Sequence, residues 1–169
     1  MRRLLCTIGF TGKTAEEFFD LLRRAGVRSV IDVRQNRTGQ LSAFAKHPDL
    51  EFFLRQIGNI GYRHEPLLAP TPELRKSYQE HKDWAVYEAG FLKLLKQRGV
   101  PKSLVASSWA ANVALLCTEP GPEKCHRRLV AELLAKHWSA AGDDVDVRHL
   151  VSSTKRGKHG KQQQHGIAS

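Results

Sequence analysis

The sequence predicts an α/β domain: a mostly parallel sheet of about five strands, flanked by helices in three layers. Short apolar segments rich in strand-forming residues alternate with longer amphipathic segments along the chain. The first three segments, residues 3–10, 14–26 and 27–34, form a β-α-β unit, and such a crossover makes the two strands parallel. A chain of 169 residues suits one domain. We place this domain at residues 1–151.

Local signals set the bounds of the predicted elements. Thr14 with Glu17 three residues later forms a capping box at the start of the first helix, and Gly26 ends that helix. Thr71 followed by Pro72 marks another helix start. Predicted strands cover residues 3–10, 27–34, 60–68, 112–119 and 144–151, and predicted helices cover residues 14–26, 49–58, 71–81, 83–99, 102–110 and 122–142.

The chain is strongly basic. It has 27 Lys and Arg against 17 Asp and Glu, a net charge of +10. This balance favours polyanionic partners, which include nucleic acid, phosphorylated small molecules and anionic lipid. Four of the basic residues lie in residues 152–169, a segment without acidic residues and almost without apolar ones. We predict a disordered basic tail there, and the body of the protein is basic as well.

Three cysteines are too few, and odd in number, for a disulfide framework. They indicate free thiols in a reducing compartment, so we expect a cytoplasmic protein. No apolar run approaches the length of a membrane span, and the start of the chain is typical of a first strand rather than a signal peptide. We therefore expect no membrane partner.

In a parallel sheet, ligands bind where the strands end at their carboxyl side. Three segments meet at that edge: the turn after Phe10, the loop after Arg34 and the loop after Cys117. The residues with chemical potential are concentrated in these segments.

The segment LLCTEPGPEKCHRRLV, residues 115–130, carries the strongest signal. Cys125 lies near the predicted start of a long helix, where the helix dipole and neighbouring cations favour the nucleophilic thiolate. We expect Cys125 to act as nucleophile or redox thiol, His126 to move protons, Glu119 to orient the site and Arg127 to bind an anion. The alternative is that Cys125 packs as a small apolar residue while its charged neighbours are solvated.

A metal site is a further alternative, because Cys117, Cys125 and His126 are suitable soft ligands. The spacing lacks the paired Cys-x-x-Cys pattern of structural zinc. Adjacent residues also point in different directions on a helix. We therefore predict no metal site.

The segment DVRQNR places Asp32 and Arg34 on one face of a strand end, where they can pair. Arg34 and Arg37 could then hold a phosphate, with Asn36 and Lys46 nearby as further substrate-binding residues. A structural Asp–Arg clamp is an equal alternative.

The segment YRHE places Tyr62 and His64 on one face of a short strand. His64 is a candidate general base, and Tyr62 a candidate substrate contact. The alternative for His64 is a half-buried ring bonded to the backbone. Trp84 and Tyr87 share a helical face, which more often belongs to the core than to a stacking surface.

Four motifs in order, TIGFTGKTAEEF, IDVRQNR, GYRHEPLLAPTPEL and LLCTEPGPEKCHRRLVAELL, resemble the family of domains of unknown function DUF488. DVRQNR, LAPT and CTEPGPEKCHRRLVAE are similar to one subgroup. Where the commonest form of the family has His-Ser after TIG, this chain has Phe10 and Thr11, so any role of that histidine does not carry over to this chain. The resemblance implies an α/β domain with a pocket between the Asp-Val-Arg loop and the Cys-His-Arg segment. It implies these pocket residues: Asp32, Arg34, Cys117, Glu119, Cys125, His126 and Arg127, with Tyr62 and His64 nearby.

The functional hypothesis is a thiol-dependent enzyme acting on an anionic substrate, a nucleotide or nucleic acid. A non-catalytic nucleic-acid-binding protein and a Cys/His metal-binding protein are the alternatives, so whether the chain is an enzyme stays open. The sequence assigns no cofactor.

Overall fold

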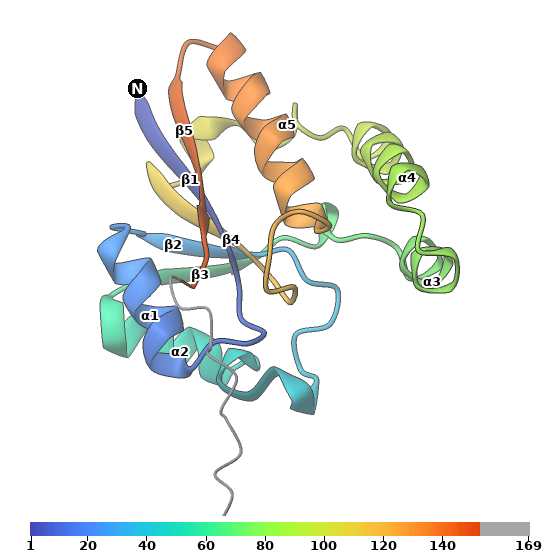
Figure 1. Ribbon diagram of the computed structural model, residues 1–169. Helices are drawn as coiled ribbons and strands as arrows, with labels where there is room; N and C mark the ends of the chain where they lie inside the picture. The colour runs from blue at the N-terminus through green and yellow to red at the C-terminus, as the bar shows by residue number, and fades with distance from the viewer. Residues whose placement is uncertain (153–169) are drawn as a thin grey trace, which may run out of the picture.

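The computed structural model describes residues 1–152 and has the predicted α/β architecture (Figure 1). The predicted tail lies outside the described residues apart from Ser152. The strands are β1 (Arg2–Gly9), β2 (Ser29–Asp32), β3 (Gly61–His64), β4 (Asn112–Cys117) and β5 (Asp144–Leu150). The α-helices are α1 (Ala15–Arg24), α2 (Asp49–Gly58), α3 (Pro72–His81), α4 (Trp84–Gln97) and α5 (His126–Ala140). Short 3₁₀ helices cover Gln40–Ala45, Pro66–Leu68 and Ala106–Ser108.

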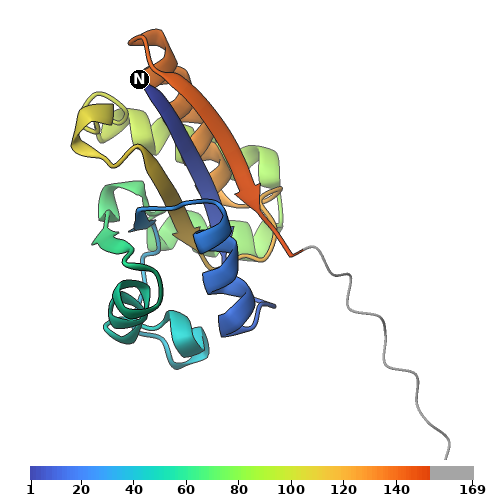
Figure 2. The same ribbon diagram turned by 90° about the vertical axis from the view of Figure 1, so that its left-hand side faces the viewer.

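The five strands form one parallel sheet in the order β3-β2-β4-β1-β5. The first and last strands of the chain, β1 and β5, lie side by side (Figure 2). Because all five strands point the same way, the segments that follow β1, β2 and β4 leave the sheet at one edge. This arrangement places the loops that carry the candidate site residues together, as the sequence predicts.

Successive side chains along the strands point to opposite faces of the sheet, so an apolar layer forms on each face. Cys6 and Ile8 face α1 and α2, and Leu5 lies on the other side of the sheet with α4 and α5. Along β4, Leu115 and Cys117 lie on the α4–α5 side. Cys6 and Cys117 therefore belong to opposite faces of the sheet. Within residues 1–152, no helix combines the length and apolar character needed to cross a membrane.

The predicted helix starts are confirmed where a capping side chain marks them. Thr14 Oγ1 accepts a hydrogen bond from the backbone N–H of Glu17 at 3.1 Å. Thr71 Oγ1 accepts one from Leu74 at the start of α3. Each bond satisfies an N–H group that the first helical turn cannot pair internally.

Two predicted helices differ from the structure. The short helix over 102–110 is reduced to Ala106–Ser108, and the carbonyl of Leu104 instead accepts a hydrogen bond from Trp138 Nε1. The last helix begins at His126 rather than Pro122. The carbonyl groups of Glu119 and Pro120 accept hydrogen bonds from a buried arginine, so they are engaged outside any helix.

Candidate active site

A cavity of about 900 Å³ lies where β1, β2 and β4 end, and α3 and α4 form its far wall. Its volume falls within the range of small-molecule sites. The end of β1 contributes Phe10 and Thr11, the loop after β2 contributes Arg34 to Asn36, and β4 contributes Cys117. The lining also includes Gly39, Gln40, Ser42, Pro70, Arg75, Tyr78, Gln79, Lys82, Trp84, Tyr87, Thr118, Glu119, Lys124, Cys125 and His126.

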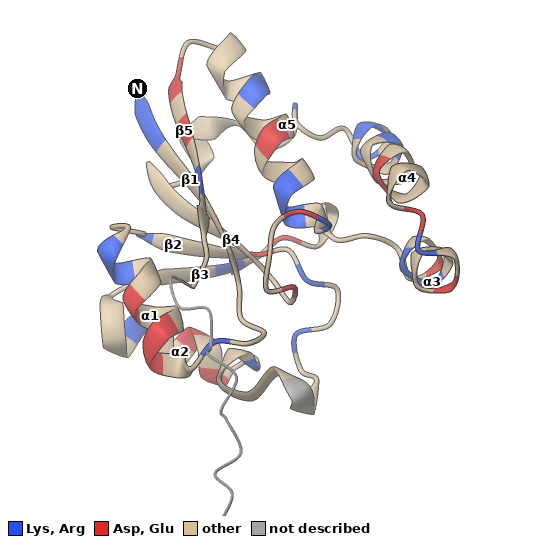
Figure 3. Cartoon of the chain, viewed as in Figure 1, with Lys and Arg blue, Asp and Glu red and all other residues tan. Residues whose placement is uncertain are grey.

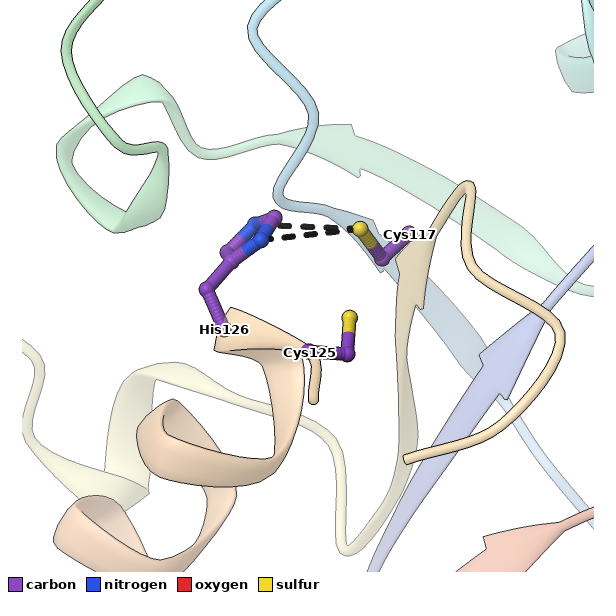
Figure 4. Close-up of side chains that lie close together, drawn as sticks. All are labelled: Cys117, Cys125 and His126. Atoms are coloured by element: carbon purple, nitrogen blue, oxygen red, sulfur yellow. Dashed lines mark hydrogen bonds between the residues drawn. The ribbon is translucent and has the colours of Figure 1, made fainter. Parts of the chain in front are cut away.

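Two sulfurs and an imidazole meet in the cavity wall (Figure 4). Cys117 ends β4, Cys125 is the N-cap residue of α5, and His126 is the first residue of that helix. The Cys117 Sγ lies 3.6 Å from His126 Nδ1, and one donor atom from each of the three residues lies within 4.8 Å of the others. All three side chains are more than nine-tenths buried. We call these three residues the Cys-Cys-His cluster.

The backbone conformation of Cys125 explains how adjacent residues converge. Its φ of −136° and ψ of 134° are extended rather than helical. Cys125 and His126 therefore leave the chain in directions that a helix would not allow. This corrects the sequence argument against a metal site, which assumed that both residues lie on the helix.

The His126 ring is oriented by a backbone group. Its Nε2 lies 3.0 Å from the carbonyl oxygen of Val33, and since a carbonyl only accepts, Nε2 carries the proton and donates. The Cys117 Sγ lies beside the ring, 3.6 Å from Nδ1 and 3.9 Å from Nε2. The ring also packs edge-on against Phe91 at 5.5 Å between centroids.

A buried arginine holds the loop that connects Cys117 to Cys125. Arg127 Nη1 donates to the carbonyl of Glu119 at 2.6 Å and to Cys125 Sγ at 3.3 Å. Gly9 permits the approach, because a Cβ there would overlap the Glu119 carbonyl oxygen. Arg127 is fully buried and does not line the cavity. Its guanidinium thus supports the loop, whereas the sequence interpretation assigned it to a substrate.

The two thiols differ in acidity. A hydrogen bond from Cys125, together with the nearby charge of His126, lowers the pKa of Cys117 well below its usual value despite burial. Donating that hydrogen bond and being buried both raise the pKa of Cys125. Burial lowers the pKa of His126, but Cys117 outweighs it and the net shift is upward. The sequence interpretation placed the thiolate at Cys125, whose sulfur accepts a hydrogen bond from Arg127 Nη1 at 3.3 Å, whereas the hydrogen bond between the two thiols favours the charge on Cys117.

The predicted pair of Asp32 and Arg34 is present as a buried clamp. The Asp32 carboxylate is fully buried and accepts hydrogen bonds from Arg34 Nε at 2.8 Å, Arg34 Nη2 at 2.7 Å and the Tyr62 hydroxyl at 2.7 Å. Arg34 Nη2 also donates to the carbonyl of Ala45. Asp32 does not line the cavity, whereas Arg34 does. Asp32 therefore positions Arg34.

The remaining predicted residues divide between the cavity and the clamp. Asn36 and Glu119 line the cavity. His64 Nε2 lies 3.0 Å from the carbonyl oxygen of Arg34, and Arg37 Nη1 donates to the Tyr62 hydroxyl at 3.3 Å. Neither His64, Arg37, Tyr62 nor Lys46 is part of the cavity lining. The first three surround the clamp, so the backbone-bonded alternative describes His64 in the structure.

The wall formed by α3 and α4 was not predicted as part of the site. Arg75, Tyr78 and Lys82 lie at helical spacing on one side of α3 and its C-cap, and all three line the cavity. Trp84 and Tyr87 belong to or pack against the core, as the sequence suggested, and they also line the cavity, with ring centroids 5.2 Å apart. Figure 3 shows basic residues on α3, on the loop after β2 and at the start of α5. The sequence signal that could have revealed this wall is the recurrence of basic and aromatic residues at helical spacing in residues 75–87.

All three cysteines are free. The Cys-Cys-His cluster offers the donors that thiophilic metal ions prefer, and the same groups in a metal-free state form a thiol–imidazole pair. The cavity wall therefore carries donor groups that suit either a metal ion or a thiol–imidazole pair.

The comparisons with known proteins identify a family. The model of the family described as Domain of unknown function DUF488 matches residues 14–134, which include the clamp, the α3–α4 wall and the Cys-Cys-His cluster. No curated protein and no solved structure gave a match. Since the family model covers well over half of a chain whose fold and motifs agree with the resemblance seen in its sequence, this protein belongs to the DUF488 family.

Proposed function

We propose that this protein is a thiol-dependent enzyme that acts on an anionic, nucleotide-type substrate bound in the cavity. One observation carries the proposal. The Cys117 sulfur lies 3.6 Å from the His126 imidazole in the wall of a cavity of about 900 Å³ that is also lined by basic side chains. A thiol–imidazole pair and basic side chains therefore line the same cavity, which supports the proposal.

The basic lining suits an anionic group. Arg75, Lys82 and Lys124 approach the cavity from α3, its C-cap and the loop before α5. Arg34 adds a guanidinium whose orientation Asp32 fixes. The cations on α3, at its C-cap and before α5 attract phosphates, and the Arg34 guanidinium, whose charge is paired with Asp32, gives directional hydrogen bonds.

The aromatic lining suits a planar ring. Tyr78, Trp84 and Tyr87 form a continuous group, with centroid distances of 5.0 Å from Tyr78 to Tyr87 and 5.7 Å from Tyr78 to Trp84. Nucleobases stack on such side chains without strong sequence preference. The combination of rings and cations favours a nucleotide over a small inorganic anion.

Binding is tested with nucleoside mono-, di- and triphosphates and a short single-stranded oligonucleotide as probes, in thermal unfolding at constant salt. A bound probe raises the melting temperature, because a ligand at about 100 times its Kd adds roughly 2.7 kcal/mol of stability. We expect Lys82→Ala and Arg75→Ala to lose this increase. If none of the probes raises the melting temperature, the nucleotide assignment is wrong.

Catalysis is tested by following each binding probe for conversion by chromatography and mass spectrometry. Cys117→Ser should retain probe binding and lose turnover, and Cys6→Ser is the matched control because Cys6 lies on the opposite face of the sheet. Turnover by Cys117→Ser at the rate of the unmodified protein would remove the cysteine from the reaction.

A second candidate is a non-catalytic nucleic-acid-binding protein, which the net charge of +10 favours. In that case the affinity for labelled single- and double-stranded oligonucleotides should fall steeply with salt, because phosphate contacts release counterions. The affinity should also be unaffected by Cys117→Ser. A flat salt response would reject this candidate.

A further inference from the structure

We infer that Cys117, Cys125 and His126 bind one thiophilic transition-metal ion of the Zn²⁺ class, with a coordination position left open toward the cavity. This deepens the proposed function and rests on its site. A Cys-Cys-His cluster can act through a free sulfur or through a bound metal ion, and the contacts around these three residues favour the metal ion.

The spacing of the donor atoms fits tetrahedral coordination. Zn–S distances of about 2.3 Å and Zn–N distances of about 2.0–2.1 Å place neighbouring sulfur and nitrogen ligands about 3.6 Å apart in a tetrahedron. The Cys117 Sγ and His126 Nδ1 are 3.6 Å apart. The two sulfurs and one nitrogen of His126 all lie within 4.8 Å of one another. Because the Cys117 Sγ is also 3.9 Å from Nε2, the imidazole must turn for Nδ1 to face an ion held by both sulfurs.

The surroundings of the cluster match the second shell of a metal site. A metal-binding histidine usually donates its other N–H to a carbonyl or carboxylate, which fixes the tautomer. His126 does this through Nε2 to Val33, which leaves Nδ1 for the ion. Arg127 donates to the Cys125 sulfur at 3.3 Å, a contact that stabilises a thiolate ligand.

Burial gives the ion an energetic role. Cys117 and Cys125 are 5% and 2% exposed, so deprotonating both would bury two negative charges, and the Arg127 guanidinium beside Cys125 offsets only one of them. A divalent ion neutralises the pair. It also explains the choice of Cys at the N-cap of α5, a position where Ser, Thr, Asp or Asn is preferred for helix stability.

The cavity makes an open position available. Structural zinc sites are closed by four protein ligands, whereas catalytic sites have three and leave one for water or substrate. Within residues 1–152, these three residues are the only group of three or more His, Cys, Asp or Glu side chains whose donors converge. All three line the cavity. An ion here would polarise a phosphoryl or carbonyl oxygen of the substrate, or activate a water molecule.

The experiment uses Co²⁺ and Zn²⁺ with the full-length, tag-free, reduced protein. Co²⁺ reports its own ligands, because thiolate ligands give intense charge-transfer absorption and tetrahedral geometry gives strong visible bands. We expect one equivalent of Co²⁺ to produce both signals and one equivalent of Zn²⁺ to displace it. If the protein is saturated with Co²⁺ but shows no thiolate charge-transfer absorption, the ion is bound only by other groups such as histidines. That result, obtained on the unmodified protein alone, would overturn the inference.

The variants locate the site. Cys117→Ser, Cys125→Ser and His126→Asn should each weaken Zn²⁺ binding more than about 100-fold in competition with a chromophoric chelator, beyond the 10–100-fold typical of outer-shell changes. Cys6→Ser should bind Zn²⁺ like the unmodified protein. Circular dichroism confirms that each variant is folded before its affinity is used. Unchanged affinity in Cys117→Ser would overturn the assignment.

The result separates this inference from the proposed function. If the cobalt signals appear but no nucleotide probe is bound or converted, the metal site stands and the proposed substrate fails. If the signals are absent but turnover depends on Cys117, the metal site fails and the sulfur itself is the reactive group.

Discussion

Replacing Asp32 with asparagine tests whether the clamp is a main element of stability. The carboxylate is fully buried and accepts hydrogen bonds from the Arg34 backbone N–H, Arg34 Nε and Nη2, and the Tyr62 hydroxyl. The amide side chain of the Asp32→Asn variant would lack the negative charge and would turn an N–H₂ group toward some of these donors. The guanidinium of Arg34, whose side chain is 2% exposed, would lose its counter-charge.

Breaking a buried ion pair by removing one partner costs about 3–5 kcal/mol. For a chain of this length, each kcal/mol lowers the melting temperature by roughly 2–4 °C, so Asp32→Asn should melt about 6–20 °C lower. Urea unfolding followed by circular dichroism gives the free energy, and differential scanning calorimetry gives the melting temperature.

The matched control is Asp146→Asn. Asp146 pairs with Arg148 at 2.7 Å, but the two side chains are 41% and 55% exposed, and exposed pairs contribute only about 0–1 kcal/mol. We expect a clear difference between the two variants. A loss below about 1 kcal/mol for Asp32→Asn, equal to that of the control, would show that the clamp does not stabilise the fold as argued.

Three further predictions concern single positions. Gly9→Ala should lower the free energy of unfolding in urea by about 1–3 kcal/mol or more, because the added Cβ overlaps the Glu119 carbonyl. Gly61→Ala, where the nearest atom to the added Cβ is at 3.5 Å, should change that free energy little. Equal losses in the two variants would refute the close-packing argument. Thr14→Ala should cost about 0.5–2 kcal/mol through loss of the α1 cap, and a neutral result would mean that the cap bond contributes nothing. Burial raises the pKa of Tyr62 to about 12, so the folded state retains the phenol proton longer than the unfolded chain and stability falls as pH rises from about 10 toward 12. Tyr62→Phe should reduce that fall in unfolding experiments at pH 8 and above pH 10, and identical pH profiles would contradict the shift.

Much of the fold could be predicted because its signals are local. The Thr14 cap, the apolar stripe behind it and the strand on either side are contained in the first 34 residues. Parallel pairing then follows from the crossover, and the shared edge of the sheet follows from parallel pairing. The start of α5 was misplaced by four residues, because Arg127 binds carbonyl groups that a helix would otherwise use.

The candidate site could be predicted only in part. Cys117, Cys125 and His126 are close in sequence and follow a strand, so their proximity was visible. Their convergence depends on the extended backbone of Cys125, which an argument from helix geometry and the helix dipole does not contain. The wall formed by α3 and α4 lies far in sequence from Cys117, Cys125 and His126. No local sequence signal shows that these helices pack beside the carboxyl ends of the strands.

The sequence by itself determined the α/β class, the parallel sheet and the gathering of polar loops at one edge, because periodicity, caps and crossovers are local properties of the chain. Only the tertiary structure decided that Arg127 and Asp32 support the site while Arg75 and Trp84 line it. The physical reason is that the residues packed over a side chain decide whether it is buried behind the cavity wall or exposed in that wall. That depends on contacts between residues far apart in the chain, such as Val33 with His126.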